Sequence, residues 1–131
     1  MRRTIPMALL VAGTLALAGA CSSKPVETEK KPAPPSPEMV AVGKELFVKN
    51  CSACHGPDAK GLPHLGKNLN QNAFVQSKTD PQLLTYVKSG RGISDPLNTT
   101  GVPMPPKGGN PALSDADIQK IIGFLRSIQQ G

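Results

Sequence analysis

The stretch Cys51-Ser52-Ala53-Cys54-His55 decides how the rest of this 131-residue chain is interpreted. Two thiols lie three positions apart, and an imidazole follows the second thiol directly. The pattern C-x-x-C-H is typical of covalent haem attachment, in which both thiols bond to one edge of the porphyrin and the histidine binds the iron. We therefore predict that Cys51 and Cys54 attach one haem c and that His55 is an iron ligand.

Two other chemistries use the same residues. A Cys51–Cys54 disulfide would make a redox motif, but such motifs normally open a helix after a strand, and this one closes a predicted helix. A zinc site needs four ligands, so His64, the second of the chain's two histidines, would have to join both thiols and His55. Chelation by adjacent Cys54 and His55 is awkward. The disulfide motif and the zinc site therefore remain as alternatives, and haem attachment is the preferred prediction.

Three side chains are candidates for the second iron ligand. Met39 lies on the apolar face of a predicted helix, where methionine usually packs in the core. His64 follows His55 by only nine residues, so its loop would have to pass around the haem edge. Met104 lies between Pro103 and Pro105 in a segment without helical or strand periodicity. We predict Met104 as the second ligand.

Histidine and methionine ligation raises the reduction potential relative to two histidines, and it fills both axial positions. An iron without an open position favours an electron carrier over an enzyme. The alternative that stays open is a haem enzyme or gas sensor in which Met104 is labile.

Apolar periodicity predicts three helices, over residues 38–49, 81–89 and 115–129. Asp80 can cap the second helix and Pro81 suits its first position. Ser114 and Asp117 form a capping-box pair at the start of the third.

The predicted first and last helices each contain a glycine, at Gly43 and Gly123. We expect these two helices to cross there, with Phe47 and Phe124 nearby. The intervening segments, 56–79 and 91–113, are rich in Gly and Pro and show no strand alternation. We expect them to be irregular and to wrap a cofactor. The predicted fold class is all-α.

The N-terminal segment is interpreted as an export leader over residues 1–20. Arg2 and Arg3 precede an apolar run that is too short to span a membrane in the usual way. The small residues Ala18-Gly19-Ala20 suit cleavage by a signal peptidase.

The third cysteine of the chain, Cys21, follows the leader directly. The stretch Leu17-Ala18-Gly19-Ala20-Cys21 resembles a bacterial lipoprotein signal, which implies a lipid on Cys21; ordinary cleavage is the other reading. Residues 21–37 are then a lipidated cysteine and a Pro-rich tether, extended by roughly 50 Å at about 3.1 Å per residue. Residues 38–131 form the folded domain.

Composition limits the function of that domain. The chain has no Trp, one Tyr and three Phe, so its core is thin, and small domains of this kind often need a covalent or metal staple. From Glu38 onward there are 10 basic and 7 acidic residues, a mild excess without a basic run interleaved with aromatics. Binding of nucleic acid is therefore not expected.

The folded domain resembles the class I c-type cytochromes. The matches are Gly43 with Phe47, the motif from Cys51 to Gly56, a helix ending in Gly90-Arg91, Met104-Pro105, and Ile121-Ile122-Gly123-Phe124-Leu125. The resemblance implies an all-α fold in which the N- and C-terminal helices cross beside a covalently bound haem. It also implies that Leu69 packs on the haem face. Lys67 stands where members often have a proline whose carbonyl orients the iron-bound histidine, so the partner of His55 is left open.

The stretch from Asn98 to Pro111 is similar to cytochrome domains attached to bacterial respiratory complexes, such as the monohaem lipoprotein subunits of alternative complex III. This implies single-electron transfer between respiratory-chain partners, an oxidase or a soluble cytochrome among them, at the periplasmic face of a membrane. Lys60, Lys67 and Lys107 are candidates for a face that docks acidic partners.

Overall fold

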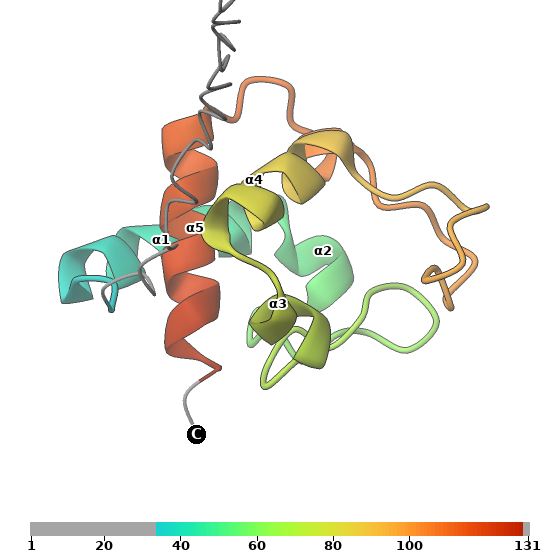
Figure 1. Cartoon of the computed structure of the whole chain (residues 1–131), viewed down its shortest axis with the longest axis horizontal. Helices are drawn as coiled ribbons and strands as arrows, with labels where there is room; N and C mark the ends of the chain where they lie inside the picture. Colours follow the sequence, from blue (N-terminus) through green and yellow to red (C-terminus); the bar gives the residue numbers. More distant parts are fainter. Residues whose placement is uncertain (1–33, 130–131) are drawn as a thin grey trace, which may run out of the picture. The chain divides into compact units, whose positions relative to one another are not determined.

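The computed structural model describes residues 34–129, so the predicted leader, Cys21 and most of the tether lie outside the described residues. The helices are α1 (Pro37–Asn50), α2 (Ser52–His55), α3 (Ala73–Ser77), α4 (Asp80–Ser89) and α5 (Asp115–Ser127), with a 3-10 turn, η1 (Pro106–Gly109), before α5 (Figure 1). Between residues 34 and 129 the extended pairings are two isolated bridges and no strand. The all-α prediction is confirmed.

Two glycines let α1 and α5 cross in close contact (Figure 1). A Cβ atom at Gly43 would collide with the Lys120 carbonyl oxygen. A Cβ atom at Gly123 would lie 2.9 Å from the Met39 sulfur. Each glycine therefore faces the opposite helix, and the predicted crossing at these two positions is confirmed.

The core lies at this crossing. The Phe47 and Phe124 rings are 5.3 Å apart between centroids and tilted by 51°, an arrangement that aromatic pairs favour. Three isoleucines of α5 are buried beside them, at positions 118, 121 and 122. The predicted apolar stripe of the last helix is the side that packs on α1 and on the loops.

Helix starts follow capping chemistry, with one correction. The Ser114 hydroxyl accepts from the Asp117 N–H, and the Asp117 carboxylate accepts in return, which is the predicted capping box. At α4 the cap is Thr79, which forms a capping box with Gln82, and Asp80 is the first helical residue. The prediction of Asp80 as the cap was wrong because the threonine before it has a partner three residues on.

Two short elements interrupt segments that were expected to be irregular. The Asn72 side chain accepts hydrogen bonds from the N–H groups of Phe74 and Val75 and so starts α3. This helix has five residues, which is too short to show an apolar period. In η1, Lys107 has a φ of 55°, a conformation that residues other than glycine seldom adopt.

Polar contacts hold the loops against the C-terminal helix. The Arg126 guanidinium donates to Asp80 at 2.8 Å, to the Val75 carbonyl at 2.7 Å and to the Lys78 carbonyl. The Gln129 amide donates to the Leu69 carbonyl at 2.7 Å. These bonds fix α3, α4 and the segment around Leu69 on α5. None of the helices within residues 34–129 has the length and apolarity needed to cross a bilayer.

Candidate functional site

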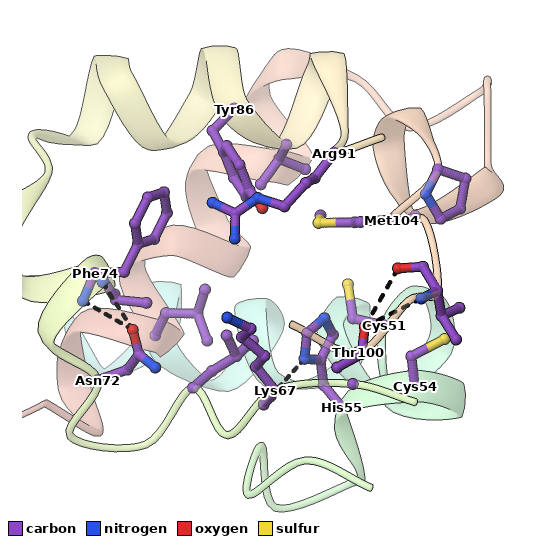
Figure 2. A pocket seen from close by; sticks show the side chains of 18 of the residues that line it. Cys51, Cys54, His55, Lys67, Asn72, Phe74, Tyr86, Arg91, Thr100 and Met104 are labelled. Carbon is purple, nitrogen blue, oxygen red and sulfur yellow. Dashed lines mark hydrogen bonds between the residues drawn. The ribbon is translucent and has the colours of Figure 1, made fainter. Parts of the chain in front are cut away.

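A cavity of about 340 Å³ lies between the C-x-x-C-H motif, α4 and the segment that carries Met104 (Figure 2). This volume falls in the range of sites for small molecules and cofactors. Apolar side chains dominate its walls, among them Leu65, Leu69, Leu83, Val87, Ile122 and Leu125. Leu69, which the resemblance places on the haem face, lines this cavity.

The motif is presented by the junction of α1 and α2. The Cys51 N–H donates to the Phe47 carbonyl at 2.7 Å, so Cys51 ends α1, and the His55 N–H donates to the Cys51 carbonyl at 3.0 Å. Both thiols and the imidazole line the cavity. No disulfide joins Cys51 and Cys54.

The surroundings of the two thiols do not favour the zinc alternative to haem. Burial raises the pKa of the Cys51 thiol to about 11, and the neighbouring Cys54 adds to the rise. A four-ligand zinc site would need His64 together with Cys51, Cys54 and His55, and His64 does not line the cavity with them. In addition, no group of three or more His, Cys, Asp or Glu side chains within the described residues is placed to hold a metal ion.

The partner of His55 is the Lys67 backbone. The imidazole Nδ1 lies 2.8 Å from the Lys67 carbonyl oxygen, which can only accept, so Nδ1 carries the proton. The other ring nitrogen, Nε2, is then left with its lone pair, as a metal ligand requires. Lys67 thus supplies the carbonyl although it is not a proline.

Two glycines bring the Lys67 peptide close enough to make this bond. A Cβ atom at Gly66 would collide with the Cys54 carbonyl oxygen, and one at Gly61 would lie 2.5 Å from the Gly66 carbonyl oxygen. Gly61 also has a φ of 83°, which favours glycine. The segment after the motif therefore folds back against α2.

Met104 lies across the cavity from His55, with its sulfur directed into the cavity in Figure 2. Its backbone pairs with Arg91: the Arg91 N–H donates to the Met104 carbonyl at 2.8 Å, and the Met104 N–H donates to the Arg91 carbonyl at 2.9 Å. Gly90, with a φ of 69°, leaves room for the Met104 carbonyl oxygen, with which a Cβ would collide. The end of α4 therefore sets the position of Met104.

The Asn98 side chain organises the rest of this segment, residues 91–104, which we call the Met104 loop. Its amide nitrogen donates to the carbonyls of Gly92 at 3.1 Å and Val102 at 2.9 Å. Its amide oxygen accepts from the N–H groups of Thr100 at 3.2 Å and Gly101 at 3.0 Å. Asn98 was not among the predicted site residues; the signal is an asparagine within a Gly- and Pro-rich segment, where such side chains close turns.

Arg91 was also not singled out as a site residue, and its signal is its position after the glycine that ends α4. Its guanidinium lies 4.9 Å from the ring centroids of both Phe74 and Tyr86, and Nη1 donates to the Leu97 carbonyl at 3.0 Å. Its Nε is buried without a hydrogen bond, 3.5 Å from Asp95. The guanidinium of Arg91 lines the cavity, and a cation at this wall suits an acidic group on a bound cofactor; haem carries two carboxylates.

The other two candidates for the second iron ligand lie elsewhere. His64 is exposed, has a φ of 60°, and is not among the residues that line the cavity. Met39 packs against Gly123 where α1 and α5 cross, and it does not line the cavity. Of the three candidates, Met104 is the one that the fold brings to the cavity with His55.

All three lysines predicted for docking have partners in their own chain. The Lys67 ammonium donates to the Leu97 carbonyl at 2.8 Å, and the Lys107 ammonium donates to the Leu113 carbonyl at 2.8 Å. Lys60 is exposed and pairs with Asp58 at 3.6 Å.

Comparison with known proteins gives one family. The family model "Cytochrome c" matches residues 40–129. The chain is 31% identical over 99 residues to the cbb3-type cytochrome c oxidase subunit CcoP of Rhodobacter capsulatus, covering 74% of this chain and 32% of the relative. Cytochrome c-555 of Chlorobaculum thiosulfatiphilum is 27% identical over 85 residues, which cover 65% of this chain and 91% of that protein.

The same fold is found in a solved structure. Cytochrome CL of Methylophaga aminisulfidivorans MPT matches with a TM-score of 0.53 and 26% identity, covering 70% of this chain and 54% of that one. The chain spans about a third of the length of the cbb3-type subunits that it matches. Because the family model covers nearly all of the described residues, this chain belongs to the cytochrome c family and has covalently bound haem c as its cofactor.

Proposed function

We propose that this protein is a monohaem c-type cytochrome that carries single electrons between respiratory-chain partners, with Cys51 and Cys54 attaching the haem and His55 and Met104 as axial iron ligands. The observation that carries the proposal is one apolar cavity with the attachment motif on one side and Met104 on the other (Figure 2). Filling of both axial positions favours a carrier rather than an enzyme.

The residues around the cavity have separate roles toward the haem. Haem c, when bound, supplies an iron that cycles between two oxidation states. The Lys67 carbonyl holds the proton of His55 on Nδ1, so that the lone pair of Nε2 would be available to bind the iron. The pairing with Arg91 holds Met104 at the opposite wall. The Arg91 guanidinium at the cavity wall would face a haem carboxylate, and the apolar lining would limit access of water to the iron.

The cellular setting is part of the proposal. Residues 1–20 would direct export, Cys21 would carry a lipid, and residues 21–37 would tether the domain at the periplasmic face of a membrane. Several relatives are subunits of cbb3-type cytochrome c oxidases, which supports a respiratory partner. The partner could equally belong to the alternative complex III group that the Met104 region resembles.

Expression of the full chain in a host that matures c-type cytochromes tests the haem proposal. Intact mass should show one covalent haem, which Cys51→Ala and Cys54→Ala together should abolish. The reduced protein should resist carbon monoxide, because Met104 occupies the iron. A mass without haem contradicts the proposal, and tight binding of carbon monoxide supports a haem enzyme or gas sensor instead.

The membrane proposal has a separate test. Cys21→Ser should move the mature protein from the membrane fraction to the soluble fraction while its haem content stays unchanged. Retention of the variant in membranes contradicts a lipid anchor at Cys21.

A further inference from the structure

Lys67 contacts both sides of the cavity with different atoms. Its carbonyl accepts from the His55 Nδ1–H at 2.8 Å. Its ammonium donates to the carbonyl of Leu97, in the Met104 loop, at 2.8 Å. One residue thus joins the segment behind the histidine to the loop that carries the methionine.

The bonds continue from Leu97 to Met104. The same Leu97 carbonyl accepts from the Arg91 Nη1 at 3.0 Å, and the Arg91 backbone makes two hydrogen bonds with Met104. A continuous path of hydrogen bonds therefore runs from His55 through Lys67, Leu97 and Arg91 to Met104.

The part of the loop that receives Lys67 has few apolar contacts of its own. Ile93 is 66% exposed and does not line the cavity, so burial of its side chain does not hold this part of the loop in place. A segment of this kind opens more readily than a packed core, and bonds to a charged donor contribute more to its closure than neutral ones.

We propose that Lys67 is a positioning residue whose ammonium latches the Met104 loop over the cavity and so keeps Met104 at the iron. This inference rests on the proposed His55 and Met104 ligation. The backbone of Lys67 serves the histidine and its side chain serves the methionine, so a change of the side chain separates the two roles.

The test uses the haem-loaded protein and its affinity for imidazole in the oxidised state. Imidazole competes with Met104 for the iron, so its apparent affinity rises with the fraction of molecules in which Met104 has left. Lys67→Met keeps the carbonyl and removes the ammonium, and should bind imidazole about fivefold more tightly than the unmodified protein. Lys67→Arg should restore most of the original affinity.

Lys60→Met is the matched control, because it removes the same charge from an exposed position in the same segment without touching the Met104 loop. It should leave imidazole affinity within about twofold of the original. An equal shift in Lys60→Met and Lys67→Met would overturn the latch in favour of a general effect of charge. Unchanged imidazole affinity in Lys67→Met, even with an altered reduction potential, would also overturn it.

Failure of the proposed function looks different. If the unmodified oxidised protein lacks the methionine–iron charge-transfer band, the ligation by Met104 is wrong and the latch falls with it. If that band is present but Lys67→Met binds imidazole with unchanged affinity, the ligation by Met104 stands and the latch alone is wrong.

Discussion

The α1–α5 frame and the Met104 loop are held by different forces. The frame buries the side chains of Phe47 and Ile121 almost completely and brings two backbones into contact at glycines. The loop leaves Ile93 and Leu97 exposed and relies on hydrogen bonds from Asn98 and Arg91. Substitutions in the frame should therefore change the free energy of unfolding, and substitutions in the loop should change how firmly Met104 stays at the iron.

The largest effect on the frame is expected from Gly43→Ala. Its Cβ would collide with the Lys120 carbonyl oxygen, so α1 and α5 must separate, and unfolding should become easier by about 3 kcal/mol. Denaturation of the haem-loaded protein by guanidinium measures this. Gly92→Ala is the control, because a Cβ there meets its nearest atom at 3.9 Å and should cost no more than about 0.5 kcal/mol. Equal costs for the two variants would refute close packing at Gly43.

A smaller loss of stability is expected from Arg126→Met, which removes the hydrogen bonds that join α5 to Asp80 and to two backbone carbonyls. We expect a cost of about 2 kcal/mol, since the side chain is only partly exposed and its bonds are charge-assisted. Lys88→Met is the control: its exposed ion pair with Asp115 should contribute at most about 1 kcal/mol. Thermal unfolding followed by circular dichroism compares the two variants. Similar melting temperatures would contradict a stabilising role for the Arg126 hydrogen bonds.

In the loop, Asn98→Ala should loosen Met104 more than it destabilises the fold. It removes the side chain that organises residues 91–104, so the oxidised protein should bind imidazole up to about tenfold more tightly. The free energy of unfolding should fall by less than about 1 kcal/mol, because the frame is untouched. Loss of stability without a change in imidazole affinity would mean that frame and loop are not separable.

The smallest effect is expected at the start of α5. Ser114→Ala removes the cap of this helix and should lower the free energy of unfolding by about 1 kcal/mol. Ser94→Ala is the control, because Ser94 is an exposed serine in a turn and caps no helix.

Hydrogen bonds from the Ser114 hydroxyl and N–H lower the pKa of Asp117. Because the folded-state pKa lies below the unfolded one, this contribution is present above the unfolded pKa and is lost as pH falls through the folded pKa. Asp117→Asn should therefore flatten part of the acid dependence of unfolding; an unchanged profile would contradict this.

Two kinds of feature could be predicted from the sequence: helices with a regular apolar period, and sites with a characteristic chemical motif. Apolar period gave the three long helices to within a few residues, and Gly43 and Gly123 gave their crossing. The C-x-x-C-H spacing and the lack of periodicity around Met104 selected residues that the fold does bring to one cavity.

What the sequence could not give depends on contacts between distant residues. The hydrogen bond from the His55 side chain is accepted by the backbone carbonyl of Lys67. Every residue type has such a carbonyl, so the identity of residue 67 does not reveal the bond. The pairing of Arg91 with Met104 needs the loop to return on itself, which no local pattern records. The cap at Thr79 was visible in the sequence, but the aspartate beside it is the better cap on propensity alone.

The ligation of the iron by Met104 is tested most directly by the methionine–iron charge-transfer band of the oxidised, haem-loaded protein. Met39→Leu is the matched variant, because Met39 lies against Gly123 and does not line the cavity. The band should be present in the unmodified protein and in Met39→Leu, and absent in Met104→Leu. A band that survives in Met104→Leu, or that is missing from the unmodified protein, would contradict the account.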